Sequence, residues 1–157
     1  MRRIVLYGVG LILASLLALS YAATSRAKTV SGPVRHNCAV TDRAFIETAK
    51  TNMAALDLWG QQYLDGDAEA GDVAAQSERA AKIVAATAPT DPSLQQARSL
   101  LVSMFSEYGK GMEAEAKHGD AGKDVYHAYG LANLTHDVLV DARAPLARRG
   151  CDVAPLL

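Results

Sequence analysis

The sequence predicts an all-α protein, an antiparallel up-down-up-down four-helix bundle with an N-terminal hydrophobic leader or anchor helix. Aromatic residues make up only 6% of the chain, alanine is abundant, and runs of β-branched residues are scarce. That composition favours helices over strands. Four segments carry apolar residues at helical spacing, and short runs rich in Gly, Pro and Asp separate them. Short connections between amphipathic helices are typical of an up-down bundle.

The N-terminus predicts export. Residues 1–23 combine Arg2 and Arg3 with an uncharged, largely apolar run from Ile4 to Ala23. Small residues near Ala22 suit cleavage of a secretory signal peptide. The run is also about 20 residues long, enough to span a bilayer as an N-terminal membrane anchor. Both alternatives place the rest of the chain outside the cytoplasm, either anchored in the cytoplasmic membrane through residues 4–23 or secreted after cleavage.

Residues 24–37 predict a flexible tether, because Ser, Thr, Gly and Pro occur there without an apolar period. The first helix is predicted from about Thr41 to Leu64, with Thr41 as its N-terminal cap. Its apolar stripe is Phe45, Ala49, Met53, Leu56, Gly60 and Tyr63. Asp65-Gly66-Asp67 then interrupts the helical pattern.

The second helix is predicted from about Ala68 to Thr87, with a thin stripe of small residues that also includes Ile83. Asp91 and Pro92 predict the start of the third helix, as its cap and first helical residue.

The third helix is expected to reach about Lys117. The fourth helix is predicted from about Ala121 to Arg143, with Leu134 on its apolar stripe, and Ala144-Pro145 is expected to end or kink it.

The two cysteines predict a disulfide. An antiparallel four-helix order brings the start of the first helix and the end of the fourth to the same end, where Cys38 and Cys151 would meet. An oxidising compartment favours a bridge over two free thiols or an intermolecular bond. Residues 38–151 are therefore predicted to be a disulfide-clamped bundle, and residues 152–157 a C-terminal tail.

A small-ligand pocket is one functional hypothesis for the half of the bundle far from the cysteines. Its predicted lining residues are Trp59, Tyr63, Tyr108, Met112 and His127. Glycines at similar height would leave space for a ligand, or would make room for the neighbouring rings. Haem ligation by Met53 or Met112 with His127 is a weaker hypothesis, because no covalent attachment motif is present.

A metal site is a further hypothesis. Glu115 precedes His118 by three residues, and Asp124 precedes His127 by three, which places each pair on one helix face. These pairs flank a turn, however, and the first two helices supply no inward carboxylate to complete a ligand set. Turn capping and solvation explain them better, so we expect no resident cofactor.

The charge pattern predicts an acidic end far from the cysteines and a basic end near them, with Arg35, Arg43, Arg143, Arg148 and Arg149. The net charge of −1 gives no sign of a nucleic-acid partner. Tyr126 and Tyr129 are expected to point away from the apolar face of the fourth helix, where they would suit an interface with an envelope protein.

We found no glycine-rich phosphate loop and no activated nucleophile. The sequence therefore favours a non-enzymatic protein-interaction module of the bacterial cell envelope, with a small-ligand or metal (haem or zinc) carrier or sensor as the alternative.

Overall fold

The computed structural model describes residues 38–157. The predicted leader (residues 1–23) and tether (residues 24–37) lie outside the described residues. Within residues 38–157 the chain is helical and contains no strand, as predicted. Its elements are α2 (Val40–Asp65), α3 (Ala70–Ala85), α4 (Pro92–Ala116), α5 (Gly122–Arg148) and the 3₁₀ turn η1 (Ala154–Leu156). No helix in this part of the chain has the length and apolarity needed to cross a bilayer.

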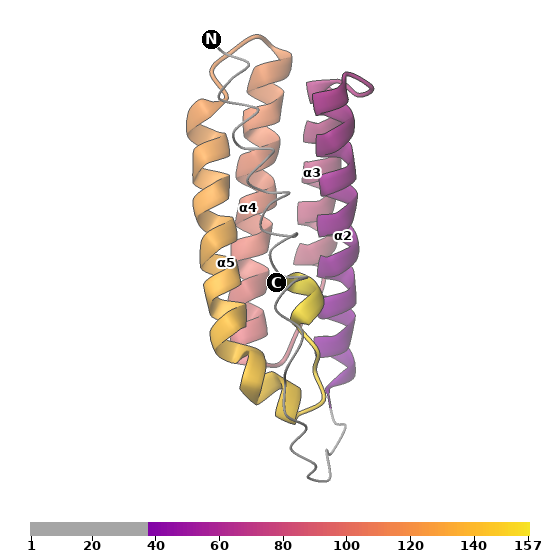
Figure 1. The fold of residues 1–157 in the computed structure, drawn as a ribbon, viewed down its shortest axis with the longest axis vertical. Coiled ribbons are helices and arrows are strands. Elements are labelled where there is room, and N and C mark those ends of the chain that lie inside the picture. Colours follow the sequence, from indigo (N-terminus) through magenta and orange to yellow (C-terminus); the bar gives the residue numbers. More distant parts are fainter. Residues whose placement is uncertain (1–37) are drawn as a thin grey trace.

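The four helices lie side by side (Figure 1). The α2–α3 and α4–α5 turns are at the upper end of Figure 1, and the α3–α4 connection and the end of α5 are at the lower end. We call the lower end, which holds Cys38 and Cys151, the cysteine end. Helix α4 packs extensively against both α3 and α5, whereas α2 packs mainly against α3. No Cα atom of α2 lies within 8 Å of a Cα atom of α5, so the bundle is open between these two described helices.

Local chemistry explains most helix ends. The carboxylate of Asp91 accepts hydrogen bonds from the backbone N–H groups of Ser93 and Leu94 at 2.9 and 3.4 Å, which confirms Asp91 as the cap of α4. Gly66 ends α2 with a φ of 86°, a left-handed conformation that glycine adopts without strain. The predicted Thr41 cap is wrong, because α2 already begins at Val40 and no side chain caps it.

Helix α5 is longer than predicted. It continues through Pro145 to Arg148 instead of ending near Arg143. Pro145 lacks the N–H that would bond the carbonyl of Asp141, and α5 bends toward its lower end in Figure 1. Leu146 is only 1% exposed, and the burial of this side chain explains why the last turn stays helical.

Two apolar residues predicted to face inward are exposed. Ile83 is 46% exposed and Leu134 is 53% exposed. At 100° per residue, Leu134 lies about 120° around α5 from the buried Ala128. The predicted stripes were therefore too wide at these two positions.

The main core lies where α4 meets its neighbours. Phe45, Leu101, Phe105 and Leu139 are essentially inaccessible to solvent. Small residues on α3 let it approach α4 closely, and the hydroxyl of Ser77 donates a buried 2.7 Å hydrogen bond to the carbonyl oxygen of Phe105. A buried hydroxyl with a partner avoids the desolvation penalty of an unpaired group.

At the cysteine end, the sulfur atoms of Cys38 and Cys151 are 2.00 Å apart, a disulfide distance, as the sequence predicts. Asp42 at the start of α2 is buried, and its Oδ1 accepts three hydrogen bonds from the α3–α4 connection. The donors are the Thr90 N–H at 2.5 Å, the Thr90 hydroxyl at 3.0 Å and the Asp91 N–H at 3.2 Å. The other carboxylate oxygen of Asp91 pairs with Arg149 at 2.8 Å. Polar contacts thus link the start of α2, the start of α4 and the end of α5.

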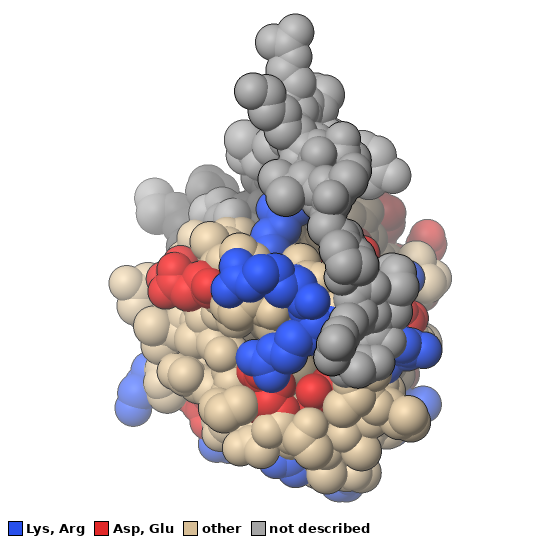
Figure 2. Space-filling model, turned by 90° about the horizontal axis from the view of Figure 1, so that it is seen from below, with Lys and Arg blue, Asp and Glu red and all other residues tan. Residues whose placement is uncertain are grey.

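Figure 2 views the molecule from this end and shows Lys and Arg side chains gathered near the middle, with Asp and Glu beside them. Neighbouring carboxylates therefore partly neutralise the positive charge at the cysteine end. Of the arginines predicted for this end, Arg149 pairs with the buried Asp91.

Two interior glycines lie in very different surroundings. A Cβ atom built on Gly111 of α4 would lie 2.7 Å from the Cγ2 atom and 3.3 Å from the backbone nitrogen of Val125, so Gly111 permits the close approach of α4 and α5. A Cβ atom on Gly130 of α5 would meet nothing within 4 Å among the described residues.

We expect Gly111→Ala to lower the free energy of unfolding by about 1–3 kcal/mol, because the added methyl group overpacks the α4–α5 interface. The matched control Gly130→Ala should instead raise it by up to about 1 kcal/mol, because alanine is the better helix former in open space. Urea unfolding followed by circular dichroism measures both values. Equal effects of the two substitutions would contradict the observed interface.

Candidate functional site

The open side of the bundle forms a groove. Its cavity, about 430 Å³ in volume, lies between α2 and α5, and α4 forms its floor. This volume falls within the range of small-molecule sites in proteins. We call this feature the α2–α5 groove.

Residues of both outer helices line the groove. On α5 the lining includes Ala128, Asn133 and Thr135, and also Val125, Tyr129, Ala132 and His136, which are spaced by four, three and four residues. That spacing places them on one side of the helix, next to the stripe that packs on α4. Helix α2 contributes Met53, Leu56, Gly60 and Tyr63, and α4 contributes Leu101, Met104, Phe105, Tyr108 and Met112. The lining is therefore mostly apolar.

The C-terminal tail closes the groove at the cysteine end. Pro155, Leu156 and Leu157 line the cavity there. Leu156 and Val153 are buried, and η1 packs against both α2 and α5. The disulfide at Cys151 fixes the start of this tail, which links two helices whose Cα atoms all lie more than 8 Å apart.

Tyr108 stands on the groove floor. Burial raises the pKa of its hydroxyl to about 12, with smaller contributions from Tyr63 and Asp57. A Cβ atom built on Gly60 would lie 3.8 Å from this hydroxyl oxygen, so the α2 wall passes close to it. The hydroxyl therefore remains protonated at neutral pH and can donate a hydrogen bond.

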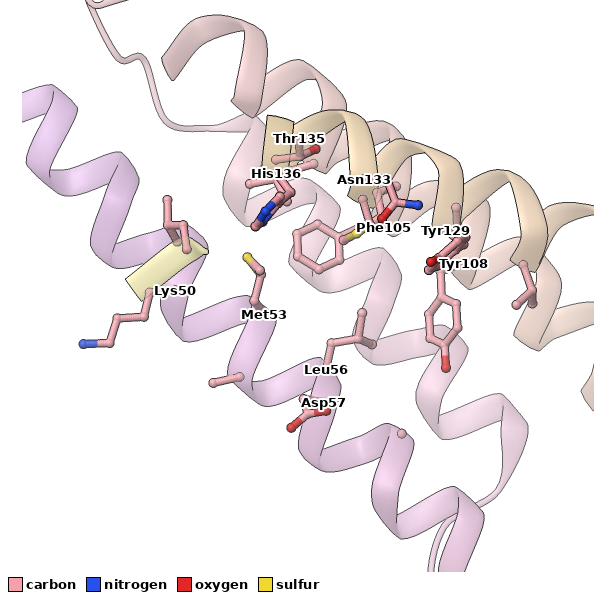
Figure 3. Close-up of a pocket in the computed structure, with 18 of the residues that line it drawn as sticks. Lys50, Met53, Leu56, Asp57, Phe105, Tyr108, Tyr129, Asn133, Thr135 and His136 are labelled. Atoms are coloured by element: carbon pink, nitrogen blue, oxygen red, sulfur yellow. The ribbon is translucent and has the colours of Figure 1, made fainter. Parts of the chain in front are cut away.

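His136 and Met53 face each other across the groove. Figure 3 shows the imidazole of His136 on α5 and the thioether of Met53 on α2 pointing toward one another, with the ring of Phe105 beside them. Lys50 and Asp57 extend outward from α2 in the same view. Neither nitrogen of His136 makes a hydrogen bond or ion pair with another residue among those the structure describes.

The structure brings together three of the five residues predicted for a ligand pocket. Tyr63, Tyr108 and Met112 line the groove. Trp59 packs instead on a small cluster around Val73 and Met112.

The fifth predicted pocket residue, His127, lies outside the groove. Its side chain is 65% exposed, and its Nδ1 atom lies 3.4 Å from a carboxylate oxygen of Glu107.

The predicted metal ligands do not form a cluster. Glu115, His118, Asp124 and His127 flank the α4–α5 turn, where His118 is exposed and adopts a φ of 57°. Within residues 38–157, no group of three or more His, Cys, Asp or Glu side chains is placed to hold a metal ion.

The two tyrosines predicted for a protein interface lie in different places. Tyr126 is 79% exposed and points to solvent, as predicted. Tyr129 lines the α2–α5 groove, although we expected it to point away from the apolar face of its helix.

Sequence reasoning missed His136. The helical pattern identified one apolar stripe on each helix, whereas His136 lies on a second, neighbouring face of α5. The signal was present, because His136 follows Tyr129 by seven residues and Ala132 by four. Met53 was assigned to the apolar stripe, but its position opposite a histidine depends on the spatial order of the helices.

Comparison of the chain with protein-family models, curated proteins and solved structures finds no match. The site is therefore interpreted from its own geometry.

The raised pKa of Tyr108 predicts a loss of stability in alkali. The unfolded chain releases this proton near pH 10 and the folded chain near pH 12. The folded state therefore binds more protons between these values, and stability falls as the pH rises from about 10 to 12. We expect the free energy of unfolding to decrease by about 1 kcal/mol per pH unit in this window.

The substitution Tyr108→Phe should remove that decrease, whereas Tyr126→Phe, at an exposed position, should leave it in place. Urea unfolding as a function of pH measures the difference. An identical pH dependence in the native protein and in Tyr108→Phe would show that this hydroxyl is not the group responsible.

Proposed function

We propose that this chain is an exported, non-enzymatic binding protein of the bacterial cell envelope, which holds a small, mostly apolar ligand in the α2–α5 groove. The observation that carries the proposal is the groove itself. The described helices α2 and α5 do not pack against each other, and the cavity of about 430 Å³ between them has a largely apolar lining. An apolar ligand in such a groove gains packing contacts with its lining residues.

In this proposal the helices form an antiparallel up-down-up-down bundle. The alternation of the connections between the two ends in Figure 1 supports this order. So does the cysteine pair, which joins the start of α2 to the segment after α5. The antiparallel order makes the first and last helices the two walls of one groove.

The proposed location is extracytoplasmic. The apolar run from Ile4 to Ala23 supports export, and a structural disulfide persists in an oxidising compartment. The protein is either anchored in the cytoplasmic membrane by its N-terminus or secreted after cleavage. Cysteines joined in a disulfide are not available as nucleophiles, which favours binding over catalysis.

A protein partner is the second candidate function, favoured by Tyr126. This side chain is 79% exposed on α5 outside the groove, and a tyrosine can anchor a partner at low entropic cost. Tyr129 is better assigned to the groove, so this candidate rests on a smaller surface than the sequence predicts.

Filling the groove tests the first candidate. Ala132→Phe places a ring into the cavity from α5, and we expect it to weaken binding of an anilinonaphthalene sulfonate fluorophore by about ten-fold or more, because it occupies the apolar space. Fluorescence titration measures the affinity.

Ala75→Phe is the matched control, because Ala75 is an exposed alanine inside α3, away from the groove. Circular dichroism verifies that both variants are folded. Equal fluorophore binding by the native protein and Ala132→Phe would place the bound probe elsewhere and contradict the proposal.

A further inference from the structure

We infer that the ligand of the α2–α5 groove is haem, a non-covalently held iron porphyrin with His136 and Met53 as its axial ligands. The inference rests on the proposed function and names the ligand class for that same groove. It replaces the predicted pairing of a methionine with His127, which lies outside the groove.

The two side chains lie at the same height in the bundle. Met53 is 13 residues after the start of α2 at Val40, and His136 is 12 residues before the end of α5 at Arg148. At 1.5 Å per residue, both lie about 18–20 Å from the cysteine end. They also face each other across the groove in Figure 3. One ligand from each wall is the arrangement that an iron between two axial ligands requires.

The chemistry of the pair suits haem iron. Imidazole nitrogen and thioether sulfur together form a well-known axial ligand set, and helical bundles build such sites from side chains on facing helices. Haem needs only two protein ligands, so the lack of a three-residue metal cluster among residues 38–157 does not conflict with it. The imidazole of His136 is also uncommitted, because it makes no hydrogen bond or ion pair with a described residue.

The walls suit a flat apolar ring. Phe105 of α4 lies beside the facing pair, and Leu56 and Tyr129 extend the apolar surface on either wall. A small residue stands near the ligands. Ala132 lies one turn along α5 from His136. This position leaves width for a macrocycle where a larger side chain would narrow the groove, and the Tyr108 hydroxyl beside Gly60 bounds the space on the α2 wall.

Charge at the mouth suits the two propionates. Lys50 lies one turn before Met53 on the groove rim, 51% exposed, and pairs only loosely with Glu47 at 3.9 Å. It can therefore turn to a propionate at little cost. Asp57 stands one turn after Met53 and would repel a carboxylate. The propionates are thus expected on the Lys50 side of the mouth.

The test is a spectroscopic titration of the native exported protein, disulfide intact, with ferric haem. We expect one haem per chain, a low-spin spectrum, and the charge-transfer band of methionine sulfur bound to ferric iron. His136→Ala should lose the low-spin spectrum, and added imidazole should restore it. Met53→Leu, which keeps the volume, should still bind haem but lose the sulfur band and show a lower reduction potential.

The matched control is His127→Ala, at an exposed histidine outside the groove, which should give the native spectrum. A spectrum that survives both His136→Ala and Met53→Leu would overturn the ligand assignment, as would its loss in His127→Ala.

The anilinonaphthalene sulfonate titration distinguishes failure of the haem site from failure of the proposed binding function. Fluorophore binding that Ala132→Phe weakens, together with no haem binding, would overturn the haem site and leave the binding function intact. If the native protein bound neither compound, both proposals would fail. Circular dichroism and a cooperative urea unfolding transition verify that His136→Ala is folded.

Discussion

The structure depends on how α2 is held. Among the described helices, α2 packs along α3 and less extensively on α4, whereas all its Cα atoms lie more than 8 Å from those of α5. Its position opposite α5 is fixed at the cysteine end, by the disulfide between Cys38 and Cys151, by the tail after Cys151, and by the hydrogen bonds that Asp42 accepts from the α3–α4 connection. A covalent link there also restricts the unfolded chain, because it closes a loop spanning 113 residues. The packing of α2 along α3 and these contacts at the cysteine end therefore set the width of the α2–α5 groove together.

The same arrangement divides the molecule into a rigid part and an open part. Close approach of α3, α4 and α5 relies on small side chains, with Ser77 bonded to the Phe105 carbonyl and Gly111 against Val125. The α2–α5 groove lies on the other side of α4, where the lining residues are mostly apolar. A groove mounted on rigid helices can hold its side chains in place before a ligand arrives, which lowers the entropic cost of binding.

Much of the fold could be predicted from the sequence because it depends on local chemistry. Rules that involve a few neighbouring residues predict the start of α4 at Asp91 and Pro92 and the end of α2 at Gly66. The expected oxidising compartment, together with the helix order, predicts the cysteine pair. The sequence left open whether Pro145 ends or kinks α5, because the burial of Leu146 decides between the two outcomes. Asp42 was missed for a similar reason, since its partners lie 48 and 49 residues away in sequence.

The site was only half predictable. A helical period identifies which residues are apolar, but it does not say which neighbouring helix each face will meet. Tyr63, Tyr108 and Met112 were found because they lie near the centre of an apolar stripe. His136 and Tyr129 lie on the second face of α5, and their role depends on the absence of direct α2–α5 packing, which is a property of the assembled bundle.

The most direct test of this account is the distance between the two walls of the groove. Nitroxide side chains introduced by genetic encoding, without added cysteines, can replace Thr51 on α2 and Asp137 on α5, two exposed residues at matching heights. Double electron–electron resonance would then give the distance distribution before and after reduction of the disulfide. The account predicts one narrow distribution in the oxidised protein that broadens on reduction. A distribution of unchanged width after reduction would contradict it.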